Sequence, residues 1–590
     1  MAFDGIVLHT LTSELKKQVN SKIDKIYQPN NSEVILQLRQ RGAGNNLMIS
    51  ISPQNSGLFT TNKKTDNPLS PPLFCMVLRK HLQGGKIVDF KQLYLDRVLI
   101  ISIEAHDEMG HTKYVELICE FMGKHSNIIL ADKSKNTIID SIKRIPPSIS
   151  SRRQILPGVT YTAPQKEAKL LLTSFFSEEE FSTRLLELPI DTPLSKCLVN
   201  IFEGFSPLLA TEVVYRAGLY IHTPMDKCGQ IEISKLYQQL LALKSIVEKQ
   251  QYTPTIALKR KEPKAFSCIA LTHLNPSYQV EQFNSTNELL SEVYFLKKRQ
   301  SKFNSFHHKL SQIVKSELDK SKKKLSIQNE VISNSKTADK YRIMGELITS
   351  NIYQIKPGTK KINVTNFYDP EQGEMEIELK PELTPSANAQ QYFKTYNKKK
   401  KAAHMAAQQK NIIESHFNYL ESLKHSLDQA ENLTDLSEIE LEMREQKLYN
   451  PISEKTNVKK KKIEYSPYQF FSSSGLEIKV GKNNKQNDWL TLKASNKEDL
   501  WFHTKDIPGA HVVITRQGQE DIDQESVNEA AMFAAYFSKA KYSNQVPVDF
   551  TQIKYVHKPS GAKPGMVIYT NQKTIFASPS EDFLKKFNLE

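Results

Sequence analysis

Cysteine is scarce in this chain, and its few thiols lie far apart. There are 5 cysteines in 590 residues, and no CxxC pair occurs among them. A disulfide scaffold needs a denser set of cysteines, and a cysteine zinc site needs paired spacing. The pattern therefore predicts buried or incidental thiols and a protein without a metal centre.

Long apolar runs are also missing. No stretch approaches the roughly 20 apolar residues of a membrane span. At the start of the chain, Asp4, His9 and Glu14 stand among apolar residues. This breaks the basic-then-apolar order of a secretory signal. We therefore expect a cytoplasmic chain that has no membrane partner.

Signatures of self-contained catalysis are absent as well. The sequence contains no HExxH or GxSxG motif, which are patterns of zinc proteases and serine hydrolases. The glycine loop Gly561–Gly565 lacks the GKS/T ending of a nucleotide-hydrolysing P-loop. We expect no catalytic centre and no cofactor.

The charge that is present is concentrated in two stretches. The formal net charge is +15. Residues 297–342 hold 13 Lys and Arg against 4 Asp and Glu, a net of +9, and residues 394–410 hold 6 Lys and no acid, a net of +6. Such clusters release counterions when they bind a phosphate backbone, but long helices also carry many solvated lysines. Charge alone favours the two readings about equally.

The length predicts several domains in a multidomain α+β fold, because 590 residues exceed what one core organises. Residues 1–165 alternate β-rich runs with polar breaks and include one run, 73–82, that is typical of a helix. We expect an α+β domain there. Its strands are predicted at 34–38, 47–51, 98–103, 114–118 and 127–130.

Helical periodicity dominates residues 166–280. Within them, Gly204 suits a turn, Ser206 a helix N-cap and Pro207 the first helical position. This pattern predicts a hairpin between two helices. A helix-hairpin-helix can approach nucleic-acid phosphates with such a turn, but many helical hairpins merely pack, which is the safer default.

Heptad spacing follows. Ile413, Leu420 and Leu427 recur every seven residues, which is coiled-coil spacing. We expect a long antiparallel coiled coil over residues 281–448, with a tip insert at about 345–385. A last β-rich domain, 449–590, begins with the basic linker Lys459–Lys462 and is expected to contain a helix from Ala530 to Ala540.

Several motifs stand in a fixed order along the chain. They are Asp96-Arg97, MGKHSN at Met122–Asn127, the hairpin at Gly204, DLWFHTKDIPGAHVVI at Asp499–Ile514 and GAKPG at Gly561–Gly565. In these motifs and their order the sequence resembles the NFACT family over nearly its whole length. The resemblance implies four parts: NFACT-N (1–165), a helix-hairpin-helix (166–280), a coiled coil with a middle insert (281–448) and NFACT-R (449–590). It also implies an N-terminal fold like the N-domains of formamidopyrimidine-DNA glycosylases.

The resemblance also implies a function. Members of this family are expected to bind a stalled large ribosomal subunit that carries peptidyl-tRNA and to recruit alanyl-tRNA. They promote untemplated alanine tailing of the nascent chain, and peptidyl transfer belongs to the ribosome. The implied partners of this chain are therefore rRNA of the large subunit, alanyl-tRNA and the peptidyl-tRNA complex.

The candidate tRNA-binding residues lie in the first domain. An arginine fork can bind a phosphate or a base edge, with a neighbouring carboxylate orienting it. For Asp96 and Arg97 a local ion pair is the better reading from the residues alone, and the resemblance to the family's tRNA signature reverses that order. For Lys124, His125 and Asn127, RNA contact and an ordinary polar turn remain equally good readings.

The candidate rRNA- or phosphate-binding residues lie later in the chain. Aromatic side chains beside basic ones suit base stacking and phosphate contact, although strand alternation sends at least one of the two aromatics of the WFHTK segment into a core. The glycine loop suits an anion cradle, and an ordinary tight turn is as good a reading. The candidates are Lys398, Lys399, Lys400, Lys401, Trp501, His503, Lys505 and Lys563.

Two other functions compete with this one. A DNA glycosylase would use an N-terminal proline followed by glutamate, but Ala2 and Phe3 stand at those positions and no cysteine-rich zinc finger follows. A surface adhesin that binds fibronectin fits an older description of the family, but no signal or anchor supports export. Fibronectin stays a possible partner only through non-standard secretion.

Overall fold

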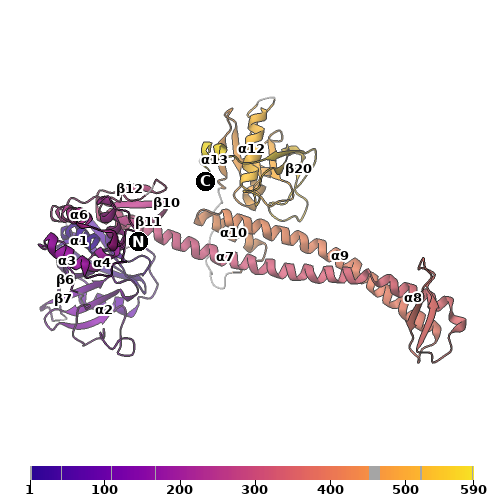
Figure 1. Cartoon of the computed structure of the whole chain (residues 1–590), viewed down its shortest axis with the longest axis horizontal. Helices are drawn as coiled ribbons and strands as arrows, with labels where there is room; N and C mark the ends of the chain where they lie inside the picture. The colour runs from indigo at the N-terminus through magenta and orange to yellow at the C-terminus, as the bar shows by residue number, and fades with distance from the viewer. Residues whose placement is uncertain are drawn as a thin grey trace. The chain divides into compact units, whose positions relative to one another are not determined.

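The computed structural model describes residues 3–40, 43–107, 109–165, 168–274, 276–450, 465–518, 521–587 and 589. The chain divides into two compact units, residues 1–301 and 302–590, whose elements are labelled in Figure 1. In this part of the chain no helix is long and apolar enough to cross a membrane, and no group of three or more metal-binding side chains occurs. The basic linker Lys459–Lys462 lies outside the described residues.

The first unit begins with a large antiparallel sheet. Its strand order is β4-β3-β2-β1-β5-β6-β7-β8-β9, so nearly all neighbours are also consecutive in sequence. The five predicted strands and the predicted helix at 73–82 are confirmed, because Val- and Ile-rich runs pack well on a pleated surface. The elements are α1 (Gly5–Leu15), β1 (Lys22–Asn30), β2 (Glu33–Gln40), β3 (Ala43–Ser50), β4 (Gly57–Thr61), α2 (Leu73–Leu82), β5 (Lys86–Gln92), β6 (Val98–His106), β7 (Thr112–Glu120), β8 (Asn127–Asp132) and β9 (Thr137–Ser141).

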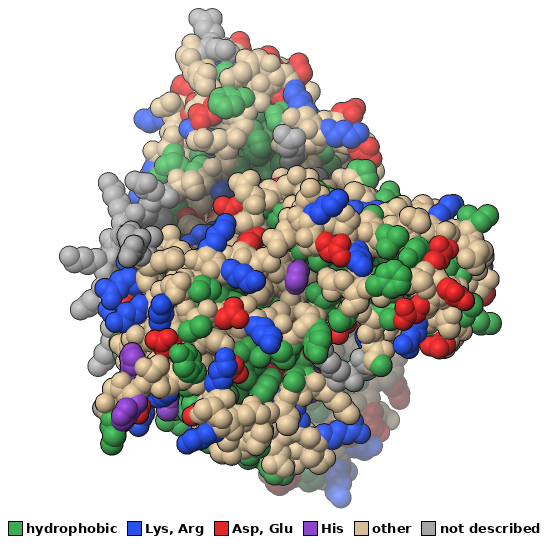
Figure 2. Space-filling model, turned by 90° about the vertical axis from the view of Figure 1, so that its left-hand side faces the viewer, with side chains coloured by type: hydrophobic (Ala, Val, Ile, Leu, Met, Phe, Trp, Pro, Cys, Tyr) green, Lys and Arg blue, Asp and Glu red, His purple; other side chains and the backbone are tan. Residues whose placement is uncertain are grey.

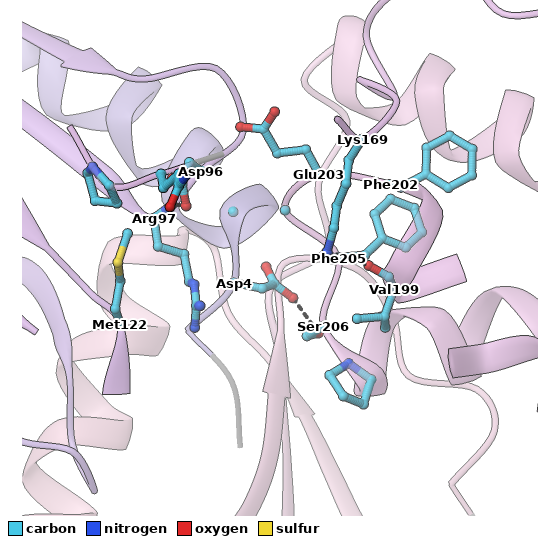
Figure 3. A pocket seen from close by; sticks show the side chains of 15 residues that line it. Asp4, Asp96, Arg97, Met122, Lys169, Val199, Phe202, Glu203, Phe205 and Ser206 are labelled. Carbon is cyan, nitrogen blue, oxygen red and sulfur yellow. Dashed lines mark hydrogen bonds between the residues drawn. The ribbon is translucent and has the colours of Figure 1, made fainter. Parts of the chain in front are cut away.

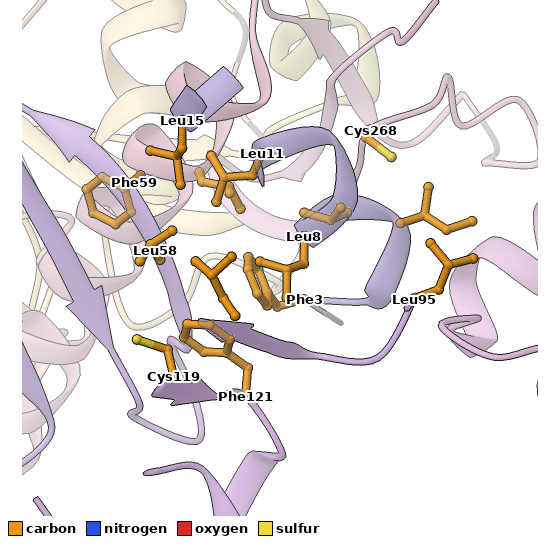
Figure 4. Packing of buried hydrophobic residues seen from close by; sticks show 14 of the residues in the cluster. Phe3, Leu8, Leu11, Leu15, Leu58, Phe59, Leu95, Cys119, Phe121 and Cys268 are labelled. Atoms are coloured by element: carbon orange, nitrogen blue, oxygen red, sulfur yellow. The ribbon is translucent and has the colours of Figure 1, made fainter. Parts of the chain in front are cut away.

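Helix α1 lies in the main hydrophobic core of this unit. Leu8 and Leu11 are fully buried, and Phe3 packs edge-on against Phe121 with ring centroids 4.9 Å apart. Figure 4 shows these side chains converging from α1, the sheet and later segments. Burial of such side chains stabilises the fold by roughly 1.5–3 kcal/mol each. The N-terminal segment is therefore fixed in the core.

Helices follow the sheet, as the periodicity predicts. They are α3 (Glu178–Leu186), α4 (Leu194–Ile201), α5 (Pro207–Arg216) and α6 (Gln230–Glu248). The predicted hairpin is confirmed between α4 and α5. The part that we expected to be helical also contains a small antiparallel sheet, in the order β11-β10-β12. Its strands are β10 (Thr255–Lys259), β11 (Glu262–Ser267) and β12 (Gln279–Gln282).

A buried carboxylate joins α5 to the segment after β11. Glu212 is 0% exposed and accepts hydrogen bonds from His273 Nδ1 at 2.6 Å, Thr272 Oγ1 at 2.6 Å and Arg216 Nε at 2.5 Å. Burial opposes its charge, but these donors prevail and hold the pKa of Glu212 at about 2. The second helix of the hairpin is therefore fixed to the segment between β11 and β12.

Long helices dominate the start of the second unit. Helix α7 (Thr286–Ser335) begins in the first unit and continues into the second, where it is followed by α8 (Ala338–Ser350), α9 (Pro385–Gln429) and α10 (Leu433–Glu445). The later part of α7 and α9 are antiparallel, because His307 meets Leu427 while Lys322 meets Phe417 (Figure 1). Leu310 and Val314 of α7 pack with Leu420 and Leu423 of α9, so the apolar positions form one seam.

The insert between α8 and α9 is a small domain with its own core. It contains the hairpin β13 (Lys361–Thr365) and β14 (Glu374–Glu378), whose Val364 and Ile377 are buried against Leu347 and Ile348 of α8. Gly345 allows a close approach, because a Cβ there would lie 2.9 Å from the ring of Phe393 in α9.

The last domain is an antiparallel sheet with helices. Its strand order is β15-β16-β18-β17-β19-β22, and β20 and β21 form a separate pair. The expected helix at 530–540 lies earlier, at 524–536, because Asp523 caps its start and Phe537 O accepts a hydrogen bond from Ala510 N. The elements are β15 (Tyr468–Phe471), β16 (Glu477–Val480), α11 (Asn484–Trp489), β17 (Leu500–Thr504), β18 (Val512–Ile514), α12 (Gln524–Tyr536), β19 (Val546–Gln552), β20 (Val556–His557), β21 (Ile568–Tyr569), β22 (Lys573–Ala577) and α13 (Glu581–Lys586).

Buried polar side chains join α10 to this last domain. Glu442 of α10 is 0% exposed and accepts from Tyr419 Oη at 2.8 Å and from Asn484 Nδ2 at 3.0 Å. Its second oxygen, Oε2, has no hydrogen-bond partner among the described residues. Burial raises the pKa of Glu442 to about 7, because a charged carboxylate loses its hydration there. The junction therefore contains a carboxyl that titrates near neutral pH.

Candidate nucleic-acid interface

Three segments that are distant in sequence line a pocket of about 450 Å³ in the first unit (Figure 3). Asp4 and Gly5 come from the start of α1, and Asp96 and Arg97 come from the turn between β5 and β6. The α4–α5 hairpin contributes residues 202–207. The structure thus brings the predicted Asp96-Arg97 pair together with the predicted hairpin.

The three segments approach at the level of the backbone, which only glycine permits here. A Cβ on Gly5 would lie 1.7 Å from the carbonyl oxygen of Leu95, and a Cβ on Gly204 would lie 2.5 Å from the same atom. Gly204 also has a φ of +81°, a conformation that favours glycine. Gly5 N donates to Gly204 O at 3.0 Å. The backbones of the three segments are therefore fixed against one another at the pocket.

The N-caps of α1 and α5 meet at the pocket. Asp4 Oδ1 accepts from Val7 N at 2.9 Å and caps α1, while Ser206 Oγ accepts from Leu209 N at 3.2 Å and caps α5. Ser206 Oγ donates in turn to Asp4 Oδ2 at 2.6 Å. Burial raises the pKa of Asp4, whereas Ser206, Val7 and the positive charge of Arg97 oppose that shift. The N-terminal ends of α1 and α5, which carry partial positive charge, therefore both lie at the pocket.

Arg97 is exposed and Asp96 is half-buried at the wall of the pocket. Asp96 Oδ1 accepts from the backbone N of Arg97 at 2.6 Å, so it orients the main chain rather than the guanidinium. Gln92 Nε2 holds the turn by donating to Asp96 O and Gly5 O, both at 2.8 Å. In Figure 3 the side chain of Arg97 extends toward Asp4. Asp96 thus does not hold the guanidinium of Arg97, which lines the pocket as an exposed cation.

The pocket offers donors and acceptors together. Arg97 and Lys169 bring positive charge to the pocket, with Lys169 donating to Val199 O, and Asp4, Asp96 and Glu203 bring carboxylates, of which Asp4 is engaged by Val7 and Ser206. Such a mixture can hydrogen-bond both phosphate oxygens and the polar edge of a base. Sequence analysis missed Asp4, Lys169 and Glu203 as pocket residues. The sequence predicted the hairpin, but no feature of the sequence indicated that the hairpin lies beside Asp96.

The turn between β7 and β8 lies next to this wall, because Met122 lines the pocket. Gly123 has a φ of +59°, and Lys124 and His125 are exposed beyond it. The prediction that Asn127 contacts RNA is wrong, since its side chain is 1% exposed. Its amide donates to Lys143 O at 2.8 Å and its Oδ1 accepts from Ile128 N and Lys143 N. Asn127 shapes the turn instead.

The lysines predicted for rRNA lie on α9 and do not share one face. Lys398, Lys400 and Lys401 are exposed, while Lys399 is half-buried with its Nζ 5.2 Å from the ring centroid of Tyr341. Consecutive residues of an α-helix are about 100° apart around its axis. These four side chains therefore surround the helix. Figure 2 shows the side of the molecule that lies on the left in Figure 1. On that face, Lys and Arg side chains are interspersed among Asp, Glu and apolar side chains.

The predicted stacking platform at Trp501 is wrong. Trp501 and Phe502 are both 0% exposed, because this strand has a hydrophobic core on each of its faces. The half-buried ring of His503 stacks on Trp501 with centroids 5.7 Å apart. Burial lowers the pKa of His503 to about 4, so its ring is neutral at pH 7. Among the predicted residues Trp501, His503 and Lys505, Lys505 is the one that is exposed.

The predicted anion cradle at Gly561–Gly565 is already filled by the protein's own carboxylate. Gly565 N donates to Asp488 Oδ1 at 3.1 Å, and Lys558 pairs with the same carboxylate. Lys563 turns inward, donating to Gln446 Oε1 at 3.1 Å with its Nζ 4.9 Å from the ring centroid of Tyr419. Lys563 is half-buried and its ammonium group contacts the junction, so its contact with an external phosphate stays a prediction.

Comparison with known proteins gives full-length relatives. The Rqc2 homolog RqcH of Bacillus subtilis (strain 168) is 38% identical over 587 residues, which is 99% of each chain. The Rqc2 homolog RqcH of Streptococcus suis (strain 05ZYH33) is 37% identical over 596 residues, which is 100% of each. The archaeal Rqc2 homolog aRqcH of Methanocaldococcus jannaschii is 25% identical over 90% of this chain and 80% of its own.

Solved structures match parts of the chain. The fibrinogen binding protein from Staphylococcus aureus is 31% identical over 50% of this chain and 99% of its own, with a TM-score of 0.42. Fpg of Lactococcus lactis, in complex with an abasic site containing DNA, is 13% identical over 42% of this chain and 78% of its own, with a TM-score of 0.21. The expected likeness to glycosylase N-domains stays a prediction at these scores.

Family models cover most of the chain. Residues 4–464 match the model of the NFACT N-terminal and middle domains, and residues 466–571 match that of the NFACT protein RNA binding domain. The relatives named above match over almost the whole length. The chain belongs to the NFACT family.

Proposed function

We propose that this protein is a cytoplasmic ribosome quality-control factor that binds large ribosomal subunits carrying peptidyl-tRNA. It recruits alanyl-tRNA for untemplated alanine tailing of the nascent chain. The protein contributes binding and positioning, and the ribosome performs peptidyl transfer. Support comes from full-length relatives named Rqc2 homolog RqcH and from the match of residues 466–571 to an RNA binding domain.

The observation that carries the proposal is the pocket at Arg97. It presents an exposed guanidinium beside two capped helix N-termini, and its carboxylates are held by hydrogen bonds within the protein. A guanidinium fork recognises phosphate or a base edge. The site therefore suits RNA, and tRNA is the RNA that we propose for it.

Subunit binding belongs to other surfaces in this proposal. The exposed lysines Lys398, Lys400 and Lys401 on α9, together with Lys505 in the last domain, are available to phosphates of rRNA. Because such contacts release counterions, association should weaken steeply with salt between roughly 50 and 200 mM.

The test is sedimentation of the full chain from lysates on sucrose gradients, followed by analysis of the RNA that co-purifies. We expect the wild type in large-subunit fractions at low salt with tRNA bound. Asp96→Ala with Arg97→Ala should lose the tRNA but keep the subunit. The control, Lys133→Ala with Lys135→Ala in the turn between β8 and β9, should keep both. Absence of the wild type from large-subunit fractions would contradict the proposal.

A further inference from the structure

A short loop follows β9. Ile145 and Ile155 close it by two backbone hydrogen bonds of 2.9 and 3.0 Å. At its tip, Pro146 O accepts from Ile149 N and Ser150 N, and the Ile149 side chain is 72% exposed. The loop is thus a defined structure whose surface is presented to solvent.

Arginines surround the closed end of this loop, and the acids near them are buried beneath. The Arg144 guanidinium forks onto Asp140 at 2.9 and 3.0 Å, with the Arg144 side chain 49% and that of Asp140 5% exposed. The Arg153 guanidinium likewise pairs with Glu120, whose side chain is 1% exposed. Arg152 between them is exposed. Arg144 and Arg152 therefore face solvent, while Asp140 and Glu120 do not.

Hydrogen bonds join the loop and the residues before it to two segments that also contribute to the pocket. Arg153 Nε donates to Thr162 O at 2.8 Å, and the chain continues from there to Pro164 and Gln165, which line the pocket. On the other side, Lys143 Nζ donates to Ser126 O at 2.9 Å. Ser126 ends the turn that starts at the pocket residue Met122 and carries Lys124.

We infer that Lys124, Arg144 and Arg152 form a phosphodiester-binding surface, here called the neck surface, that holds the backbone of an RNA whose neighbouring nucleotide occupies the pocket. The inference rests on the proposed function and adds a second set of contacts to it. Arginine forks match phosphate geometry. The buried carboxylate of Asp140 fixes Arg144 through Nε and Nη2 without exposing negative charge. An RNA strand that leaves the pocket past Met122 meets these cations next.

The experiment measures binding of total deacylated tRNA to the purified full chain at several salt concentrations. Each phosphate contact contributes roughly 0.7–0.9 to the slope of log affinity against log salt. Arg144→Gln with Arg152→Gln should therefore lower the slope by about 1.4–1.8. The control, Lys133→Gln with Lys135→Gln at the opposite end of β8, removes the same charge from the same sheet and should leave the slope unchanged.

One further variant keeps the outcomes distinct. Arg152→Gln alone removes an exposed side chain, so it guards against a folding defect from the unpaired Asp140, and it should lower the slope by about half as much. If tRNA binds the wild type and depends on Arg97, but the slope is the same in both neck variants, the neck surface is refuted and the proposed function stands. If the wild type binds no tRNA, both fail. A loss of subunit association with unchanged tRNA binding would assign the neck to another partner and overturn the inference.

Discussion

Ser206 donates its hydroxyl hydrogen to Asp4 across 2.6 Å, and each of these two residues caps a different helix. They are 202 positions apart in sequence. The hydrogen bond thus joins the start of the sheet domain to the hairpin of the helical part at the point where Arg97 enters the pocket. The pocket depends on this contact for its geometry.

Ser206→Ala should therefore destabilise the protein more than the loss of an ordinary cap. Removal of a serine N-cap costs about 1 kcal/mol, and leaving Asp4 without its buried donor adds about 1–3 kcal/mol. Ser177→Ala is the matched control, because Ser177 caps α3 by accepting from Glu180 N at 3.1 Å in an exposed position. Urea unfolding of both variants gives the comparison. Equal losses would show that the bond to Asp4 contributes nothing to stability.

Gly204→Ala should disturb the pocket through sterics as well as backbone strain. The new Cβ would lie 2.5 Å from Leu95 O, and the residue has a φ of +81°. Gly218→Ala isolates the strain, because Gly218 has a φ of +74° but nothing lies within 4 Å of its Cβ position. We expect Gly218→Ala to cost about 1–2 kcal/mol and Gly204→Ala clearly more, with weaker tRNA binding. Similar melting temperatures for the two variants would contradict the close approach of the backbones.

Stability should fall as pH rises from about 4.5 to about 7 because of Glu442. Its pKa is about 7 in the folded protein against an ordinary 4.5, so the folded state holds this proton more tightly than the unfolded one. The stabilisation is complete below about pH 4.5 and is lost as pH rises to about 7, on the order of 3 kcal/mol in all. Unfolding by urea at pH 5, 6, 7 and 8 measures this slope.

Glu442→Gln mimics the neutral carboxyl and should flatten the decline between pH 5 and pH 8. It can keep the hydrogen bonds from Tyr419 and Asn484, which Oε1 accepts in the wild type. Asp132→Asn is a suitable control, since this carboxyl stands at the end of β8 and its pKa is lowered instead. A pH slope that is the same in Glu442→Gln and the wild type would exclude Glu442 as its source.

The sequence by itself determined the local elements. Val- and Ile-rich alternation located the strands, and Gly204, Ser206 and Pro207 located the hairpin, because caps and turns depend on neighbours only a few residues away. Strand alternation also indicated that one aromatic at 501–502 is buried. Alternation could not show that both aromatics are buried. Burial of both requires a second layer over the other face of the sheet, and residues 490, 513, 553 and 556 supply it.

Only the tertiary structure decided which residues meet. It placed Asp4 and Gly204 beside Arg97, turned Asn127 into the fold and filled the GAKPG loop with Asp488. Each of these outcomes depends on contacts between segments from 16 to about 200 residues apart. Hydrogen-bonding groups within a motif are satisfied by whichever partner the packed core brings near. The motif therefore named candidate residues, and long-range packing determined which of them face a ligand.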